Sequence, residues 1–169
     1  MPAGDLPLAA IADAGPLIHL DELNVLDILA GFTAVLVPSI VATETSRRRH
    51  GWRERAPACL HVEDPDPAAV QRLLARSSGA ELDPGEVAAL ALWEDHRDAV
   101  LLCDDLAARR YAESLGCPIA GTLGLLLWAT RSGRLDRERG RQLIAALPSR
   151  TTLYIRPSLV AEALRSLDD

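Results

Sequence analysis

Short apolar runs alternate with longer stretches of helical periodicity along most of this 169-residue chain. Apolar runs bounded by turn residues are typical of buried strands, whereas leucines spaced by three or four positions are typical of helices. We expect strands at residues 8–12, 34–37, 59–62, 99–103 and 117–120, and a short one around 154–155. We expect helices at residues 16–29 with a break near Asn24, and at 39–46, 68–76, 84–96, 105–115, 122–131, 136–147 and from 157 onward.

This alternation predicts an α/β fold with three α/β/α layers, in which helices cover both faces of a mostly parallel central sheet. Local signals support one helix boundary in particular. Asp83 is a candidate N-cap, Pro84 takes the first helical position and Glu86 lies in the first turn. In such sheets ligands bind beyond the carboxyl ends of the strands, so we expect functional side chains there.

The composition fits an ordinary globular protein, with 49% hydrophobic and 25% charged residues. We expect one domain over residues 1–169, with a core at about 8–130, closing helices at 131–169 and a loose leader at 1–7. We find no apolar run that would cross a bilayer and no secretory signal. The three cysteines lack a paired spacing and are typical of reduced thiols. These features predict a cytoplasmic protein without membrane contact.

The net charge of −6 counts against a nucleic-acid-binding protein, because such proteins usually have a basic surface. All 18 basic residues are arginines, however, and arginine binds phosphate through a planar fork. Within residues 47–57, a mobile loop or helix extension by its composition, the candidates for RNA binding are Arg47, Arg48, Arg49, Trp52 and Arg53. Trp52 would stack on an unpaired base. The alternative interpretation is that the charged side chains of residues 47–57 form a solvent-exposed surface without a binding role.

Four acidic residues follow strands or begin helices of the predicted sheet. Asp13 ends the first strand and Asp104 the fourth, while Glu44 and Glu86 lie near the starts of helices. These positions share one edge of a parallel sheet, so the four carboxylates would converge and hold Mg²⁺ or Mn²⁺. A bound water would then attack a phosphorus atom, with one of the acids accepting its proton.

Each acid also has a local explanation. Asp13 would cap the helix that follows it, Glu86 would favour its helix dipole, and Glu44 would pair with an arginine one turn away. Asp104 and Asp105 would serve as N-cap and first-turn acid. For Asp13 we favour function, because a carboxylate at the end of an apolar strand needs a strong partner or a purpose.

Four segments in order resemble the PIN-domain family, the fold of VapC-type toxin ribonucleases. They are Ile11–Leu17, Val37–Glu44, Leu82–Leu90 and Leu101–Arg109, and Gly121–Gly124 resembles the last family segment before the closing helices. The resemblance covers about residues 8–130 and is closest to a PIN-like subgroup often found beside small antitoxin-like genes.

The resemblance implies a metal-dependent endoribonuclease, the toxin of a toxin–antitoxin pair, that forms a homodimer and binds a cognate antitoxin. Asp13 matches the first family acid and Glu44 the second. Glu86 takes the third position, where many members carry Asp, and Asp104 the fourth, with Asp105 as an adjacent metal-ligand candidate. Gly15 departs from the family, since many relatives have Ser or Thr there.

Other side chains give weaker signals. The four histidines show no paired metal-ligand spacing, and Cys103 is expected to be a buried, inert thiol. Thr122 would cap the helix it begins and face the crevice. A second hypothesis therefore stays open: a PIN-fold protein with weak or no nuclease activity that acts as a nucleic-acid- or partner-binding module.

Overall fold

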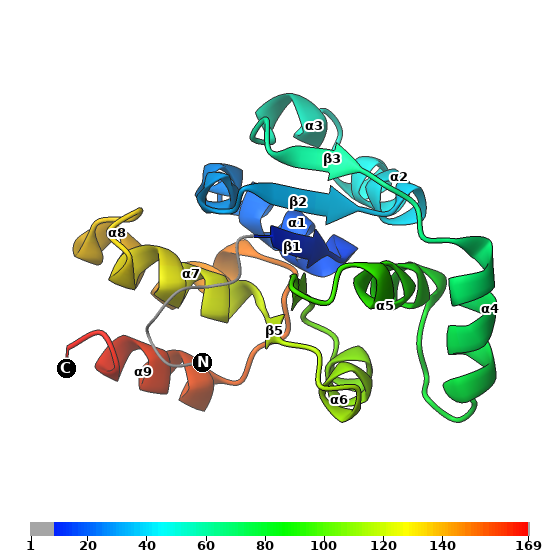
Figure 1. Ribbon diagram of the computed structural model, residues 1–169. Helices are drawn as coiled ribbons and strands as arrows, with labels where there is room; N and C mark the ends of the chain where they lie inside the picture. The colour runs from blue at the N-terminus through cyan, green and yellow to red at the C-terminus, as the bar shows by residue number, and fades with distance from the viewer. Residues whose placement is uncertain (1–8, 169) are drawn as a thin grey trace.

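A five-stranded parallel sheet with the strand order β3-β2-β1-β4-β5 forms the centre of the molecule. The computed structural model describes residues 9–168 (Figure 1). The strands are β1 (Ala9–Ala12), β2 (Ala34–Val37), β3 (Leu60–Val62), β4 (Val100–Leu102) and β5 (Ile119–Ala120). The expected leader at residues 1–7, and Leu8, lie outside the described residues. The mostly parallel sheet that the sequence predicts is confirmed, because every strand pair is parallel.

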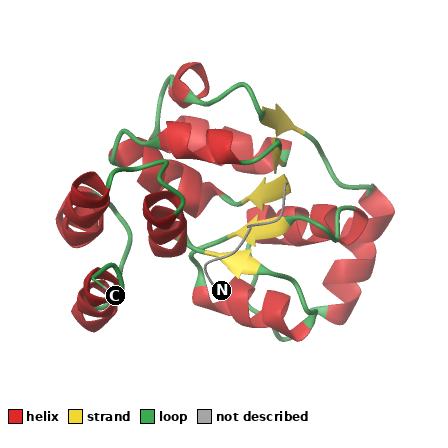
Figure 2. Ribbon diagram, turned by 60° about the vertical axis from the view of Figure 1, so that its left-hand side comes forward, coloured by secondary structure: helices red, strands yellow, loops and turns green. Residues whose placement is uncertain are grey.

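Helices cover both faces of this sheet, which gives the expected three α/β/α layers (Figure 2). They are α1 (Ala14–Glu22), the 3-10 helix η1 (Leu26–Gly31), α2 (Ser39–Arg48), α3 (Trp52–Arg55), α4 (Pro67–Arg76), α5 (Pro84–Asp95), α6 (Leu106–Ser114), α7 (Thr122–Arg131), α8 (Arg137–Arg150) and α9 (Pro157–Arg165). One apolar core joins the sheet to α1, η1, α7 and α8. A second core joins the other face to α4, α5 and α6. No helix in the described range is long and apolar enough to cross a membrane.

The strands alternate between the two cores residue by residue. In β1, Ala10 and Ala12 face the α1 side, whereas Ile11 faces the α5 side. In β4, Leu102 faces the α1 side and Leu101 the α5 side. This is the two-residue period of a strand, and because both faces are covered β1, β2 and β4 are apolar throughout. The same alternation continues into the residues that follow the strands and so governs the site.

The expected strand at residues 154–155 is wrong. That segment is coil, and it joins α8 to α9 without pairing with any strand of the sheet. Glu22 at the end of α1 holds the segment instead, because its Oε2 accepts a hydrogen bond of 2.9 Å from the backbone N–H of Thr152. The expected helix break near Asn24 is found, and Asn24 adopts a positive φ of 57° between α1 and η1.

The arginine-rich segment is fixed to α1 by a buried ion pair. Asp21 is 1% exposed and accepts hydrogen bonds from Arg49 at 2.6 Å and from Arg55 at 2.7 and 2.9 Å. Desolvation alone would raise the pKa of Asp21, but the hydrogen bonds from both guanidinium groups lower it. The segment is therefore a helix extension to Arg48 followed by a short anchored helix, and not a mobile loop.

Replacing Asp21 by Asn should destabilise the fold. The amide is neutral and loses the charge-assisted hydrogen bonds, so we expect the free energy of unfolding to fall by about 1–3 kcal/mol, measured by urea denaturation at pH 7. Asp27→Asn is the matched control, since Asp27 is exposed on η1. The pairing depends on an ionised Asp21 with a lowered pKa, so the deficit should shrink as the pH falls through that pKa. Equal stability of the two variants at pH 7 would contradict the assignment.

Candidate metal centre

The site lies where the order of the strands reverses. From β1 the chain proceeds outward to β2 and β3, and it later returns to place β4 and β5 on the other side of β1. The loops after β1 and β4 therefore diverge and leave a crevice at the carboxyl ends of these two strands. Asp13 directly follows β1, and Cys103 and Asp104 directly follow β4.

The two-residue period of β4 sends Cys103 and Asp104 to opposite sides, and the register between β1 and β4 decides which of them lies beside Asp13. Ala12 pairs with Leu102, and the N–H of Asp13 donates to the carbonyl of Leu102 at 2.9 Å, so Cys103 is the neighbour of Asp13. Cys103 belongs to the core on the α5 side. Asp104, one residue later, binds side chains of α1 and α7.

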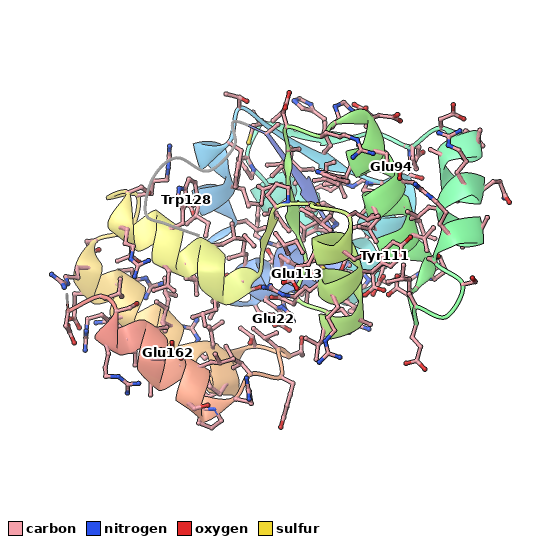
Figure 3. The ribbon with its side chains drawn as sticks, turned by 60° about the horizontal axis from the view of Figure 1, so that its bottom comes forward. Glu22, Glu94, Tyr111, Glu113, Trp128 and Glu162 are labelled. Carbon is pink, nitrogen blue, oxygen red and sulfur yellow. The ribbon has the colours of Figure 1, made fainter. Side chains whose placement is uncertain are left out.

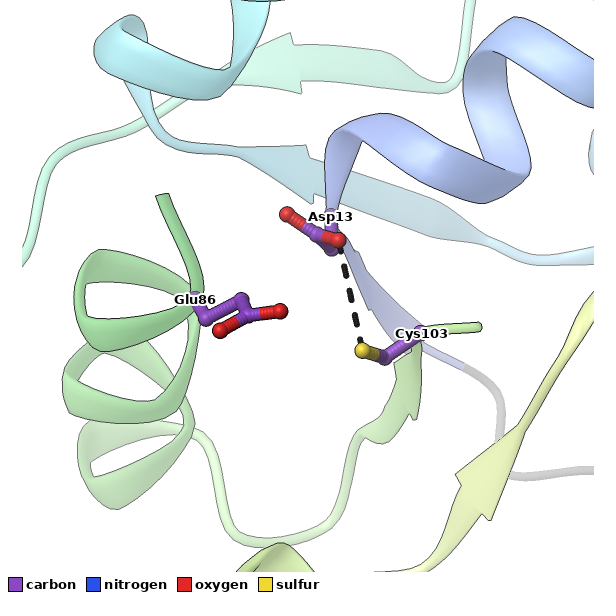
Figure 4. A group of neighbouring side chains, drawn as sticks. All are labelled: Asp13, Glu86 and Cys103. Carbon is purple, nitrogen blue, oxygen red and sulfur yellow. Dashed lines mark hydrogen bonds between the residues drawn. The ribbon is translucent and has the colours of Figure 1, made fainter. Parts of the chain in front are cut away.

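Asp13, Glu86 and Cys103 form a buried group on the α5 side (Figure 4). One possible ligand atom from each residue lies within 4.8 Å of the others. The exposed fractions are 8% for Asp13, 6% for Glu86 and 1% for Cys103. The Cys103 thiol donates a weak hydrogen bond to Asp13 Oδ2 over 4.0 Å. Asp13 occupies the N-cap position of α1, where the N–H groups of Ala14 and Gly15 favour its ionised form, but its side chain makes no capping hydrogen bond.

Glu86 has both a structural and a potential ligand role. It forms a capping box with Asp83 at the start of α5: Glu86 Oε2 accepts the N–H of Asp83 at 2.8 Å, and Asp83 Oδ1 accepts the N–H of Glu86 at 2.9 Å. Figure 4 shows the Glu86 carboxyl group directed toward Asp13 and Cys103. The capping box thus fixes the rotamer that presents this carboxylate to the site.

Burial makes both carboxylates reluctant to ionise. Desolvation raises the pKa of Asp13 to about 7, with further contributions from Asp83 and Glu44, while the N–H groups at the start of α1 act in the opposite direction. Desolvation likewise raises the pKa of Glu86 to about 7, with contributions from Asp83, Asp105 and Asp13. Two ionised acids this close repel each other and destabilise the fold when no cation is bound, and a divalent ion would remove that repulsion.

Burial raises the pKa of the Cys103 thiol far above its usual range, and the charge of Asp13 adds to this. Cys103 is buried, as the sequence predicts, but it is not remote from the candidate centre. The two carboxylates supply the oxygen ligands that Mg²⁺ and Mn²⁺ prefer, whereas a thiol suits softer ions. The donor set therefore fits a hard divalent cation held by Asp13 and Glu86, with Cys103 as a wall of the site.

Asp104 is held in a separate network on the α1 side. Its Oδ1 accepts the backbone N–H of Thr122 at 2.8 Å, and its Oδ2 accepts the Thr122 hydroxyl at 2.6 Å and His19 Nδ1 at 2.9 Å. Facing a carboxylate oxygen, Nδ1 must carry the proton. Gly121 permits this arrangement, because a Cβ there would lie 2.7 Å from Asp104 Oδ1. The carboxylate also lies at the N-terminus of α7, where the helix dipole favours it.

One cavity of about 450 Å³ joins the two groups. Its lining includes six acidic side chains, from α2, α5 and the loops after β1 and β4: Asp13, Glu44, Asp83, Glu86, Asp104 and Asp105. Arg48 and His19 are the basic side chains of the lining, and Arg48 lies 3.8 Å from Glu44. So dense a set of carboxylates attracts cations and repels a phosphate unless a cation is bound.

All four expected acids thus line the same cavity, but they are not equivalent. Asp13 and Glu86 are in direct proximity, Asp104 is engaged by Thr122 and His19, and Glu44 is half-buried beside Arg48. Asp105 caps α6, with Oδ1 accepting the N–H groups of Ala107 and Ala108.

The expected base-stacking role of Trp52 is wrong. Its ring is 1% exposed, packs in the core on the α1 side and donates from Nε1 to the Ser46 hydroxyl at 2.9 Å. Arg49 is engaged by Asp21, and the guanidinium of Arg53 lies 5.9 Å from the centre of the Trp52 ring. Arg47 lines a groove next to the cavity, and Arg48 lines the cavity itself.

Sequence reasoning missed two residues of the site. The sequence predicts Asp83 only as an N-cap, yet it lines the cavity. Its charge raises the pKa of Asp13, whereas on Glu86 the lowering effect of its backbone N–H outweighs the raising effect of its charge. The sequence gives no second histidine at metal-ligand spacing from His19, but the partner of His19 in the structure is Asp104. The available signal was the position of His19 in the first helix after Asp13, at the same sheet edge.

A sequence model for a family described as a PIN domain matches residues 9–169. No curated protein matches the chain.

Replacing Asp13 by Asn should stabilise the metal-free protein at alkaline pH. The raised pKa means that folding favours the protonated form, so wild-type stability falls as the pH rises from about 4 to about 7 and stays low above that range. Asn resembles the protonated form, and we expect the melting temperature in chelator at pH 8 to rise by roughly 4 °C or more. The difference should vanish near pH 4. The exposed Asp98→Asn variant is the control, and a gain independent of pH would contradict this explanation.

Proposed function

The chain belongs to the PIN domain family, and on that premise we propose that it is a divalent-metal-dependent endoribonuclease. PIN domains are generally metal-dependent nucleases, so a nuclease activity is the family expectation. The observation that carries the proposal is the buried pair of Asp13 and Glu86, whose pKa values are raised to about 7 within a cavity lined by acids. This arrangement is unfavourable for the metal-free fold and suited to a cation.

We propose that Asp13 and Glu86 would hold Mg²⁺ or Mn²⁺ directly. Glu44, Asp104 and Asp105 line the same cavity and would act through water. When bound, the ion would lower the pKa of a water molecule and neutralise charge on a phosphodiester. A carboxylate of the cavity would accept the proton of the attacking water, and the products would be a phosphate monoester and a free hydroxyl group.

The role of Asp104 in this proposal depends on its partners. Thr122 and His19 fix the orientation of its carboxylate through three hydrogen bonds of 2.6–2.9 Å. Such support holds a ligand in place and keeps its charge in the cavity. Gly15 stands where many family members have Ser or Thr. A Cβ at this position would lie 3.6 Å from Asp104 Oδ2 and 3.7 Å from His19 Cε1, so the glycine leaves space beside both side chains.

The biological setting is proposed from the family resemblance. We propose that the chain is the toxin of a toxin–antitoxin pair, forms a homodimer and is neutralised by a cognate antitoxin. The free state of Cys59, Cys103 and Cys117 supports a cytoplasmic location. For RNA contact we retain Arg47, Arg48 and Arg53, whose positions beside the cavity or on the surface favour phosphate binding.

A second candidate function is a binding module without hydrolysis. Full engagement of Asp104 by Thr122 and His19 favours it, because that carboxylate has little remaining capacity for a metal. The two candidates differ in whether a divalent cation binds at Asp13 and Glu86, and then in whether RNA is cut.

Metal binding should strengthen with pH. Asp13 and Glu86 must lose protons to bind a cation, so the affinity for Mn²⁺ should rise by up to about tenfold per proton for each pH unit below about 7 and level off above it. Calorimetric titration in two buffers of different ionisation enthalpy measures the protons released. We expect Asp13→Asn and Glu86→Gln to abolish binding and Asp98→Asn to leave it unchanged. Affinity that is constant from about pH 5.5 to about pH 8 would argue against these ligands.

Cleavage should depend on the same two side chains. Incubation of a mixed single-stranded RNA pool with Mn²⁺ should give products that disappear with chelator. Asp13→Asn and Glu86→Gln should each slow cleavage about a hundredfold or more, because a bound metal contributes several kcal/mol to catalysis. Retained cleavage by Asp13→Asn would reject the mechanism. Metal binding without cleavage of any RNA would favour the binding module.

A further inference from the structure

The segment between α8 and α9 forms one wall of the acidic cavity. Thr152, Leu153 and Tyr154 line the cavity together with Asp13, Glu44 and the other acids. Figure 1 shows this segment as the orange coil that leads into α9. It reaches the crevice from the C-terminal part of the chain, remote in sequence from all four family segments.

Side-chain hydrogen bonds hold this segment in place. Glu22 Oε2, at the end of α1, accepts both the N–H of Thr152 at 2.9 Å and its hydroxyl at 3.3 Å (Glu22 is labelled in Figure 3). The hydroxyl of Thr151 donates to the Leu147 carbonyl at 2.7 Å and accepts the N–H of Leu153 at 3.3 Å. Leu153 packs against the core on the α1 side. Tyr154 is therefore presented from an anchored position.

Among the Phe, Tyr and Trp residues of the described chain, Tyr154 is the one whose ring is almost fully exposed to solvent. It is 93% exposed, whereas Trp52, Trp93 and Phe32 are at most 3% exposed. Tyr111 and Trp128 are half-buried, and Trp128 stacks on Phe32 with 5.1 Å between ring centres. A ring with both faces accessible at the edge of a cavity offers a flat surface for another π system.

Two arginines stand on either side of Tyr154 in the sequence. Arg150 and Arg156 are exposed, and neither guanidinium group has a hydrogen bond or ion pair within residues 9–168. The interior of the cavity is acidic, and this segment combines an aromatic ring at the cavity with arginines close to it in the sequence whose charge is not neutralised. Basic side chains interleaved with an aromatic ring are suited to a nucleic-acid strand, with phosphates on the arginines and a base on the ring.

We propose that Tyr154 stacks on an unpaired base of the strand whose phosphodiester enters the acidic cavity, so that the substrate is single-stranded. The proposal rests on the proposed nuclease function. Bases of a duplex are already stacked within it, so the ring discriminates in favour of unpaired segments. The segment then positions the strand, and the carboxylates act on the phosphodiester beside the stacked base.

The test compares Tyr154→Ala and Tyr154→Phe with Leu74→Ala, an exposed apolar residue on α4, as the matched control. Fluorescence anisotropy with Mn²⁺ present measures binding of a labelled single-stranded oligoribonucleotide and of its duplex, both with a backbone that cannot be hydrolysed. We expect Tyr154→Ala to weaken single-strand binding by about fivefold to a hundredfold and to leave duplex binding unchanged. Tyr154→Phe keeps the ring and should bind as the wild type does.

Two further readouts separate stacking from other roles. A 2-aminopurine in the oligonucleotide should be quenched by the wild type and by Tyr154→Phe, but not by Tyr154→Ala. In Mn²⁺, Tyr154→Ala should raise KM for single-stranded RNA with little change in kcat. Cleavage by the wild type together with unchanged KM and binding in Tyr154→Ala would overturn the proposal while the nuclease function stands.

The remaining outcomes are also decisive. If the wild type cuts no RNA but binds single strands through Tyr154, the nuclease function fails and the stacking surface stands. If Tyr154→Ala instead changes the sedimentation of the protein without affecting RNA binding, the ring belongs to a contact between copies and the proposal is wrong. Unchanged melting temperatures of the variants exclude misfolding as the cause.

Discussion

The in-register pairing of β1 with β4 is the constraint on which the site depends. Because Ala12 lies opposite Leu102, Asp13 and Cys103 leave the sheet side by side and toward α5. Asp104, one residue further, leaves toward α1 and α7 and meets His19 and Thr122. A slip of one residue would exchange these directions. The register thus determines both which carboxylate joins Glu86 and which is engaged elsewhere.

Some carboxylates of the cavity are held there by the same bonds that begin the helices. Glu86 is fixed by its capping box with Asp83, and Asp105 caps α6. Local and functional explanations, which look like alternatives in the sequence, therefore apply together to Glu86. The fold supplies enough local stabilisation to keep acids with raised pKa values close to one another. The fold therefore sets the geometry of such a site without a bound cation. The cation is needed only to reduce the repulsion between the carboxylates.

The sequence predicts the fold more fully than the site. The apolar run at 34–37 matches β2, and the turn residues Asp83 and Pro84 mark the start of α5, because these signals are local. The placement of Cys103, and not Asp104, beside Asp13 depends on strand register, which pairs residues about ninety positions apart. Trp52 lies among arginines in the sequence, yet two of them bind Asp21 on α1 and its ring is buried. Asp21 lies outside the arginine-rich segment, so no local sequence pattern predicts this contact.

The same long-range contacts change the meaning of the net charge of −6. Six of the acids line one cavity, where a divalent cation would offset part of their charge, whereas exposed arginines such as Arg150 and Arg156 stand outside it. A sum over the chain merges these two populations and hides their separation. Phosphate attraction depends on the local field, and exposed arginines outside the cavity would attract a strand whose phosphates reach the acids only when a cation is bound. An acidic protein can therefore present a surface suited to nucleic acid, provided that its acids are confined to the place where the cation binds.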